Sequence, residues 1–285
     1  AAIAGVFTTN LVKAAPVLWT RDVCARGRAR AVFANSGNAN ACTGAQGLED
    51  ARATAAHAAA ALGGAPEEIA VLSTGVIGVP LPMDRILKGV DACIAALSPD
   101  GGADAAQAIM TTDTVPKSMA VEMNIGGRAV RIGAMAKGAG MISPKMATML
   151  CVIGTDAPIA SQPLLMALTD AVDQSFNRIC VDNDMSTNDT VLCLANGLAG
   201  DEPIVPGSPD FTVFAEALEE ICLALAQALV RDGEGATKFV AITVEGAASD
   251  ADAERIARAV AASQLCKTAF FGQDPNWGRI ACAAG

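Results

Sequence analysis

The stretch Gly138-Ala-Gly-Met-Ile-Ser-Pro-Lys-Met-Ala-Thr148 joins two apolar segments near the middle of the chain. Its glycines permit a tight bend, and Thr148 follows that bend at the start of a predicted strand over residues 148–153. A threonine hydroxyl is a weak nucleophile, but an N-terminal threonine carries its own base, an amine with a pKa of about 7.7–8.0. We therefore interpret the stretch as a self-cleavage site, where a break between Ala147 and Thr148 would create the catalytic group.

On both sides of this stretch, β-type segments alternate with amphipathic helical segments. Short runs of β-branched or aliphatic residues, bounded by Gly, Asn or Asp, predict strands over residues 29–35, 69–73, 129–134, 148–153, 190–195 and 238–244. Apolar residues three and four positions apart predict helices over residues 48–62, 83–97, 162–175, 212–230 and 250–263. The alternation indicates an α/β sandwich with two lobes of comparable length, separated near residues 155–160.

Composition excludes several classes of protein. Of the 285 residues 52% are hydrophobic, which is enough for one large core or two lobes. Lys and Arg number 20 against 30 Asp and Glu, and aromatic residues make up only 4%, so the charge and stacking groups of nucleic-acid-binding proteins are lacking. Glu216, Glu219 and Glu220 interrupt the longest apolar helical run, so no transmembrane helix is predicted.

The ends and the cysteines of the chain indicate its setting. No secretory signal opens the sequence, and both ends interrupt apolar segments, so we expect the chain to be part of a larger cytoplasmic protein. Nine cysteines are scattered without any Cys-x-x-Cys pair, and there is a single His. Buried reduced thiols are therefore expected, rather than disulfides or a metal site.

Two polar turns follow predicted strands. Asn35-Ser-Gly-Asn-Ala-Asn-Ala-Cys-Thr-Gly44 carries three amide side chains, and is either a structural turn or a support for a neighbouring site through Asn35, Asn38 or Asn40. In Ser73-Thr74-Gly75, a small residue followed by glycine allows backbone N–H groups to converge on an oxygen, as in an oxyanion hole. An ordinary strand-to-loop turn explains the same residues.

Three further segments are candidates for substrate contacts. Thr114 lies in a loop rich in hydroxyl groups, which is either a helix exit or a substrate-contacting loop. Lys137 precedes its glycines, so it does not form a phosphate-binding loop; it either pairs with a carboxylate of a small substrate or is a solvated surface lysine. Glu234, between two glycines, either binds the ammonium group of an amino acid or is a solvated loop charge.

The segment of residues 181–190 alternates Asp182, Asp184 and Ser186 in the manner of a calcium-binding loop. Counted from Asp182, it lacks the glycine at position six and the glutamate at position twelve. We expect a hydrogen-bonded turn that leads into the strand from Thr190 and borders the site.

Taken together, these blocks resemble the arginine-biosynthetic ornithine acetyltransferase family. The similarity spans nearly the whole chain, occurs in the family's order, and is most specific in the block around Thr148. The matching blocks are Asn35-Ser-Gly-Asn-Ala-Asn-Ala-Cys-Thr-Gly44, Ser73-Thr-Gly-Val-Ile-Gly78, Thr111-Thr-Asp-Thr114, Lys137-Gly-Ala-Gly-Met-Ile-Ser-Pro-Lys-Met-Ala-Thr-Met-Leu150, Asp184-Met-Ser-Thr-Asn-Asp-Thr190, Arg231-Asp-Gly-Glu-Gly-Ala-Thr-Lys238 and Asp274-Pro-Asn-Trp-Gly-Arg279.

The resemblance implies an enzyme that moves the acetyl group of N2-acetylornithine to glutamate without a cofactor, and it leaves open whether acetyl-CoA is an alternative acetyl donor. It implies Thr148 as the nucleophile, Thr74 and Gly75 as the oxyanion site, and Thr114, Lys137, Thr148 and Glu234 as substrate contacts. It also implies cleavage between Ala147 and Thr148 into a large chain (1–147) and a small chain (148–285).

The same resemblance implies an α/β layered fold like that of N-terminal-nucleophile enzymes, and an assembly of two large and two small chains. Family members continue past the Asn276-Trp-Gly-Arg279 block, and further substrate contacts, an Asn and a Ser or Thr, lie in that continuation. Met185 stands where the family usually has a small polar residue, and Cys180 and Cys282 stand where other small residues are common, so modest differences in packing are expected.

Two other functions compete with acetyl transfer. An amidohydrolase or aminopeptidase with the same kind of nucleophile would pass the acyl group to water. A non-catalytic binding protein would tolerate the loss of Thr148, but the sequence shows no surface that favours it.

Overall fold

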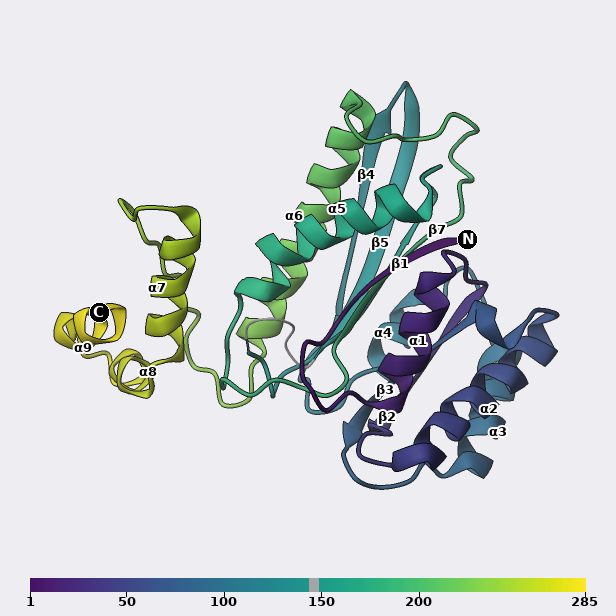
Figure 1. Cartoon of the computed structure of the whole chain (residues 1–285), viewed down its shortest axis with the longest axis horizontal. Helices are drawn as coiled ribbons and strands as arrows, with labels where there is room; N and C mark the ends of the chain where they lie inside the picture. The colour runs from purple at the N-terminus through teal and green to yellow at the C-terminus, as the bar shows by residue number, and fades with distance from the viewer. Residues whose placement is uncertain (144–148) are drawn as a thin grey trace.

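The fold is described for residues 1–143 and 149–285 in a computed structural model (Figure 1). The strands are β1 (Ala2–Phe7), β2 (Ala31–Asn38), β3 (Ile69–Val76), β4 (Lys117–Ile125), β5 (Arg128–Lys137), β6 (Leu150–Thr155) and β7 (Thr190–Ala195). The helices are α1 (Ala15–Ala25), α2 (Gly44–Leu62), α3 (Met83–Ala95), α4 (Gly102–Ala108), α5 (Ser161–Gln174), α6 (Pro209–Arg231), α7 (Asp250–Ala262), α8 (Gln264–Phe271) and α9 (Trp277–Ala284).

The strands form a larger and a smaller sheet. The larger sheet has the order β1-β7-β6-β5-β4, in which β6 and β7 are parallel and the other neighbours antiparallel. The smaller sheet pairs β2 and β3 in parallel. Parallel strands require a long crossover, which α5 supplies between β6 and β7. In this register Lys137, the last residue of β5, lies opposite Leu150, the first residue of β6.

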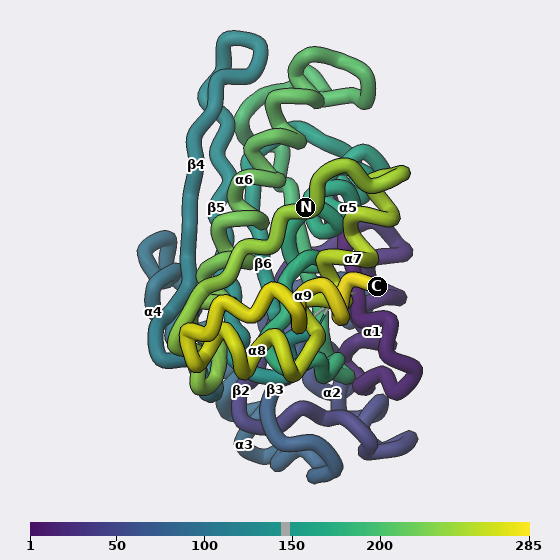
Figure 2. Tube along the Cα trace, turned by 90° about the vertical axis from the view of Figure 1, so that its left-hand side faces the viewer, coloured from purple at the N-terminus to yellow at the C-terminus, as the bar shows by residue number. Residues whose placement is uncertain are grey.

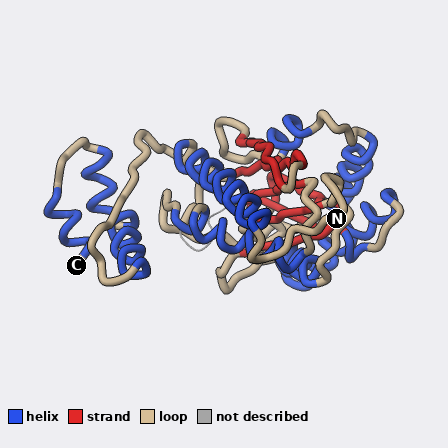
Figure 3. The backbone as a smooth tube through the Cα atoms, turned by 90° about the horizontal axis from the view of Figure 1, so that it is seen from above, coloured by secondary structure: helices blue, strands red, loops and turns tan. Residues whose placement is uncertain are grey.

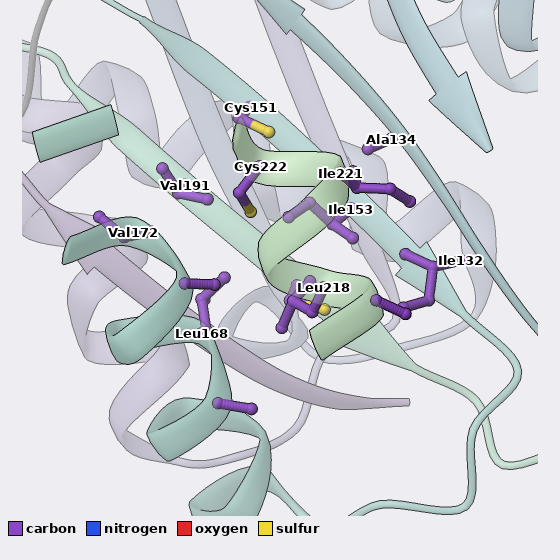
Figure 4. Close-up of a cluster of buried hydrophobic side chains, with 14 of the residues drawn as sticks. Ile132, Ala134, Cys151, Ile153, Leu168, Val172, Val191, Leu218, Ile221 and Cys222 are labelled. Carbon is purple, nitrogen blue, oxygen red and sulfur yellow. The ribbon is translucent and has the colours of Figure 1, made fainter. Parts of the chain in front are cut away.

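One face of the larger sheet packs on α5 and α6. Side chains alternate between the two faces of a strand, so Cys151 and Ile153 of β6 point to the same side. They share a buried cluster with Leu168 of α5 and with Leu218 and Cys222 of α6 (Figure 4). Burying each large aliphatic side chain stabilises the fold by about 1.5–3 kcal/mol, so this layer contributes much of the stability.

The opposite face of the larger sheet packs on the smaller sheet. Leu150 and Leu192 share a buried cluster with Leu72 of β3. Ile69 and Val71 of β3 point the other way and pack on α2 and α3. The order of layers is therefore helices, larger sheet, smaller sheet, helices, and Figure 3 shows the strands enclosed between helices. The predicted α/β layered sandwich is confirmed.

The prediction of a strand over residues 238–244 is wrong. The structure has no strand in this segment, which follows α6 after residues 232–237, and Phe239 and Val240 are exposed there. A strand requires a neighbouring backbone for its hydrogen bonds, and none of the described strands pairs with this segment. The β-branched composition indicates a local preference for extended backbone, but it does not indicate whether a partner strand is present.

The last three helices pack on one another beside the sandwich (Figures 1 and 2). One hydrogen bond that ties them to the sandwich runs from Asn183 Nδ2 to the carbonyl of Ala262, at 2.8 Å. Their apolar side chains remain partly uncovered: Trp277 is 79% exposed and Phe271 is 67% exposed.

The prediction of buried thiols holds for four of the nine free cysteines: Cys151, Cys193, Cys222 and Cys266. It is wrong for Cys42, Cys93 and Cys282, which are exposed. Burial raises the pKa of the Cys222 thiol to about 12, so it stays protonated and behaves as a small apolar side chain.

Candidate active site

The Thr74–Gly75 turn lies at the end of β3, where the chain bends sharply. Gly75 has φ of +130°, and a Cβ atom built on it would lie 2.2 Å from the carbonyl carbon of Gly37 on β2. Only glycine fits at this position. The hydroxyl of Ser73 donates to Asn35 Oδ1 at 2.6 Å, and the Asn35 amide donates to the carbonyl of Asn38. The asparagines of the first polar turn thus support the Thr74–Gly75 turn from β2.

Lys137 reaches the Thr74–Gly75 turn from the end of β5. Its ammonium group donates to Thr74 Oγ1 at 3.1 Å and to Thr111 Oγ1 at 2.7 Å. Lys137 is only 2% exposed, so it is not a solvated surface lysine. Burial lowers the pKa of Lys137, and the charge of Asp113, whose Oδ2 lies 3.9 Å from Nζ, opposes that shift.

Asp113 is the centre of a buried cluster of charges. Its Oδ1 accepts from Lys117 Nζ and from the backbone N–H of Gly138, both at 2.7 Å. Its Oδ2 accepts from the N–H of Thr111 at 3.1 Å. Burial acts to raise the pKa of Asp113, but Lys117, these two N–H groups and the charge of Lys137 together lower it below its ordinary value.

Lys117 connects this cluster to the end of α6. Its ammonium group also donates to Asp232 Oδ2 at 2.6 Å, and the side chains of both residues are almost completely buried. Asp232 in turn accepts from the backbone N–H of Thr114 at 3.0 Å and from the Thr114 hydroxyl. Lys117 therefore links the loop that carries Thr114 to the segment that carries Glu234.

Lys117→Met is expected to destabilise the fold by about 3–5 kcal/mol, because it removes the ammonium group that contacts the buried carboxylates of both Asp113 and Asp232. Urea unfolding followed by circular dichroism measures the change. The control is Lys88→Met on α3, an exposed lysine, which should change the stability by less than about 0.5 kcal/mol. Equal stabilities of the two variants would show that the cluster contributes nothing to the fold.

Glu234 follows Asp232 after one residue and lies beside the Gly138–Gly140 bend. Its backbone N–H donates to the carbonyl of Ala139 at 2.7 Å. A Cβ atom on Gly140 would lie 2.7 Å from Glu234 Oε1, so the carboxylate rests against this glycine. Glu234 is exposed, and within the described residues no cation forms an ion pair with it. The carboxylate is therefore available to an ammonium group.

Asp189 holds the start of β6. Its Oδ1 accepts from the backbone N–H of Met149 at 2.9 Å, and Met149 directly follows Thr148 in sequence. The side chain is fully buried, and its Oδ2 receives no hydrogen bond from the described residues. Burial raises the pKa of Asp189 well above its ordinary value, since the Met149 N–H opposes the shift only in part.

This raised pKa predicts a specific pH dependence of stability. The unfolded chain releases the proton of Asp189 near its ordinary pKa of about 3.9, whereas the folded protein keeps it to higher pH. The stability that the proton provides is complete below about pH 3.9 and is lost as the pH rises through the folded pKa. The side chain of the Asp189→Asn variant does not ionise and keeps an acceptor for the backbone N–H of Met149. The melting temperature of this variant, relative to that of the wild type, should therefore increase as the pH rises from about 4 to 8. Thermal unfolding across this pH range measures the difference between the two melting temperatures. Asp100→Asn, at an exposed turn, is the control. A difference that does not change with pH would contradict the raised pKa of Asp189.

Asn188 joins the two sheets beside Asp189. Its amide donates to the carbonyls of Ala39, at 2.7 Å, and Ser73, at 2.8 Å. The segment after residue 181 is therefore a hydrogen-bonded turn at the border of the site, as predicted. Met185 contacts the N-terminal segment, where Asn10 Nδ2 donates to its carbonyl at 2.9 Å.

The structure brings most of the predicted site residues together. Thr74 and Lys137 are in direct contact, Thr114 is connected to Lys137 through Asp232, Lys117 and Asp113, and Glu234 lies on the bend that follows Lys137. Ala147 and Thr148 lie outside the described residues.

Sequence reasoning assigned no role to four ionisable residues of this site whose side chains the fold almost completely buries: Asp113, Lys117, Asp189 and Asp232. The one available signal is the spacing of Asp113 and Lys117, four residues apart in a segment otherwise rich in hydroxyl groups. Within residues 1–143 and 149–285, no three His, Cys, Asp or Glu side chains are grouped as a metal site would require. No helix in the same ranges is both long and apolar enough to cross a membrane.

The chain is similar to known proteins over its whole length. A family model described as "ArgJ family" matches residues 1–285. The arginine biosynthesis bifunctional protein ArgJ of Symbiobacterium thermophilum is 59% identical over 284 residues, covering 100% of this chain and 71% of that protein. The protein of the same name from Geobacter sulfurreducens is 55% identical over 285 residues, covering 100% of this chain and 72% of that protein.

A solved structure is also similar. The ornithine acetyltransferase of Mycobacterium tuberculosis, crystallised with ornithine, is 47% identical, with a TM-score of 0.47. The matched region covers 53% of this chain and 77% of that chain.

Proposed function

Because the chain belongs to the ArgJ family, we propose that it transfers the acetyl group of N2-acetyl-L-ornithine to L-glutamate in arginine biosynthesis. The family match over residues 1–285 carries the proposal. The geometry supports it, since the Thr74–Gly75 turn, the buried ammonium group of Lys137 and the Glu234 carboxylate, which has no ion pair among the described residues, lie near the end of β5, and β5 pairs with the strand that follows Thr148. These are the groups that acyl transfer between two amino acids requires.

In the proposed first stage the chain cleaves itself. The Thr148 hydroxyl attacks the carbonyl carbon of Ala147, and the peptide becomes an ester on Thr148 Oγ with a free amine. Water hydrolyses this ester and releases residues 1–147 as the large chain. Residues from 148 onward form the small chain, whose Thr148 amine is now a base beside its own hydroxyl.

In the second stage the acetyl group moves twice. The Thr148 amine takes the hydroxyl proton while Oγ bonds to the acetyl carbon of acetylornithine, and the electron pair of the carbonyl moves to its oxygen. Thr74 and Gly75 donate to that oxyanion. When the intermediate collapses, the C–N bond breaks and the ornithine amine leaves with the proton; the glutamate amine then takes the acetyl group by the reverse path.

Two of the site residues suit the amino-acid parts of the substrates. The exposed carboxylate of Glu234 is placed to bind an ammonium group. Thr114 is hydrogen-bonded to Asp232, two residues before Glu234 in the sequence. We assign both residues to substrate binding.

Intact-mass spectrometry and steady-state kinetics test this function. Two polypeptides, the second beginning with Thr148, and parallel lines in a double-reciprocal plot of acetylornithine against glutamate are expected. Intersecting lines would exclude the acetyl-threonine intermediate. Release of acetate without dependence on glutamate would instead favour the hydrolase. A protein that tolerates the loss of Thr148 and shows no covalent acetylation would favour the non-catalytic binding protein.

We extend the proposal to acetyl-CoA as a second acetyl donor, since the similar proteins are named bifunctional. Acetyl-CoA should then acetylate Thr148 in the absence of acetylornithine. Mass spectrometry of the small chain after incubation with acetyl-CoA alone tests this; an unmodified chain that acetylornithine does acetylate would restrict the enzyme to one donor. We further propose a cytoplasmic assembly of two large and two small chains, which native mass spectrometry would reveal.

A further inference from the structure

The contact between Lys137 and Thr74 is not explained by a role in substrate binding. The two residues are 63 positions apart in sequence and belong to different sheets, yet Lys137 Nζ lies 3.1 Å from Thr74 Oγ1. Both are buried, with exposures of 2% and 3%. A lysine that only pairs with a substrate carboxylate has no need of this bond.

The direction of the hydrogen bond follows from the chemistry of the two groups. An ammonium group has three donors and no lone pair, so Thr74 Oγ1 is necessarily the acceptor. The Thr74 hydroxyl then keeps its own proton for another acceptor. Because a hydroxyl hydrogen rotates to suit its surroundings, the bond from Lys137 turns this proton away from the lysine.

The surrounding charges keep Lys137 suited to this task. The ionisable groups that act on it are Asp113, Lys117, Asp189 and Glu234. Asp113 lies 3.9 Å away and favours the ammonium form, while Lys117 neutralises the other oxygen of Asp113. The cluster therefore holds a positive charge directly behind the hydroxyl of Thr74, in a buried environment where screening by water is weak.

We propose that Lys137 is a positioning residue of the oxyanion site: it holds Thr74 Oγ1 as an acceptor, so that the hydroxyl proton of Thr74 faces the acyl oxygen. The positive charge of Lys137, which is separated from that oxygen by the Thr74 hydroxyl, further stabilises the negative charge that forms there. This inference rests on the proposed acetyl transfer. It assigns Lys137 to the rate of the chemical step, whereas a contact with a substrate carboxylate would affect binding.

A double-mutant cycle with Thr74→Val and Lys137→Met tests the proposal. Each single variant should slow the formation of the acetyl-enzyme by about 10²–10³-fold, the usual effect of losing an oxyanion donor, with KM values within about threefold of the wild type. Since Lys137 acts through Thr74, the double variant should be no more than about threefold slower than Thr74→Val. Thr169→Val, on the exposed surface of α5, is the control for a threonine-to-valine change.

Two results would overturn the proposal. Multiplication of the two single effects in the double variant would show that Lys137 acts independently of Thr74. A raised KM with an unchanged kcat in Lys137→Met would assign the residue to the substrate carboxylate. A wild-type protein that transfers no acetyl group would refute the proposed function itself, before any variant is compared.

The pH dependence gives a second test that needs no Lys137 variant. The rate of acetyl-enzyme formation in the wild type should fall on the alkaline side as Lys137 loses its proton. In Thr74→Val this fall should disappear, because the valine side chain accepts no hydrogen bond from the ammonium group. The same alkaline fall in both proteins would contradict the coupling.

Discussion

Thr148→Ala is expected to abolish both self-cleavage and acetyl transfer. Alanine has no hydroxyl to attack the carbonyl of Ala147, so the base at residue 148 is never released from the peptide bond. Loss of a covalent nucleophile lowers kcat by at least about 10⁴-fold in enzymes of this kind. Intact-mass spectrometry should show one uncut chain, and an assay with labelled acetylornithine should show no transfer.

Thr148→Ser is the matched variant, because it keeps the hydroxyl and removes only a methyl group. It should retain part of both activities. Transfer by a folded Thr148→Ala protein would remove Thr148 as the nucleophile. Cleavage without transfer in Thr148→Ser would show that the two stages place different demands on the side chain.

Gly75→Ala is the second change with a large expected effect. The new Cβ would lie 2.2 Å from the carbonyl carbon of Gly37, and backbone atoms cannot move aside as a side chain can. The φ of +130° adds strain of about 1–3 kcal/mol for any residue with a Cβ. The turn must therefore shift, and the loss of its oxyanion donor should lower kcat by about 10²–10³-fold.

Gly78→Ala separates backbone strain from the clash. Gly78 also has positive φ, of +85°, but a Cβ there would meet no atom within 4 Å. It should lower the stability by about 1 kcal/mol and leave kcat within about threefold of the wild type. Thermal unfolding and single-turnover acetylation measure both effects. Equal losses of kcat in the two variants would mean that strain, and not the close approach to Gly37, governs the turn.

The layers of the fold could be predicted because their signals are local. The apolar spacing of residues 212–230 predicts α6 to within a few positions, and residues 69–73 identify most of β3. β4 was missed because it is an edge strand whose exposed positions carry polar residues such as Glu122. Residues 238–244 were misread for the opposite reason, since a β-like composition does not supply a partner strand.

In the site as well, sequence predicts the features with a local signal and misses those that depend on the fold. Thr74, Gly75, Lys137 and Glu234 stand in recognisable blocks, so sequence could single them out. Their mutual contacts depend on how β3, β5 and the end of α6 converge, and no spacing along the chain records that. Asp189 is the clearest example: only the fold shows that its carboxyl group is buried against the backbone of Met149.

The order of the larger sheet decides what a break between residues 147 and 148 would do to the molecule. β5 precedes the break and β6 follows it, and the two are hydrogen-bonded neighbours along six paired positions. β1 and β7 are likewise neighbours from opposite sides of the break. The two pieces would thus be complementary fragments of one sheet rather than separable domains. Each made alone would expose an unpaired strand edge, so we expect activity to be regained only when the pieces are refolded together.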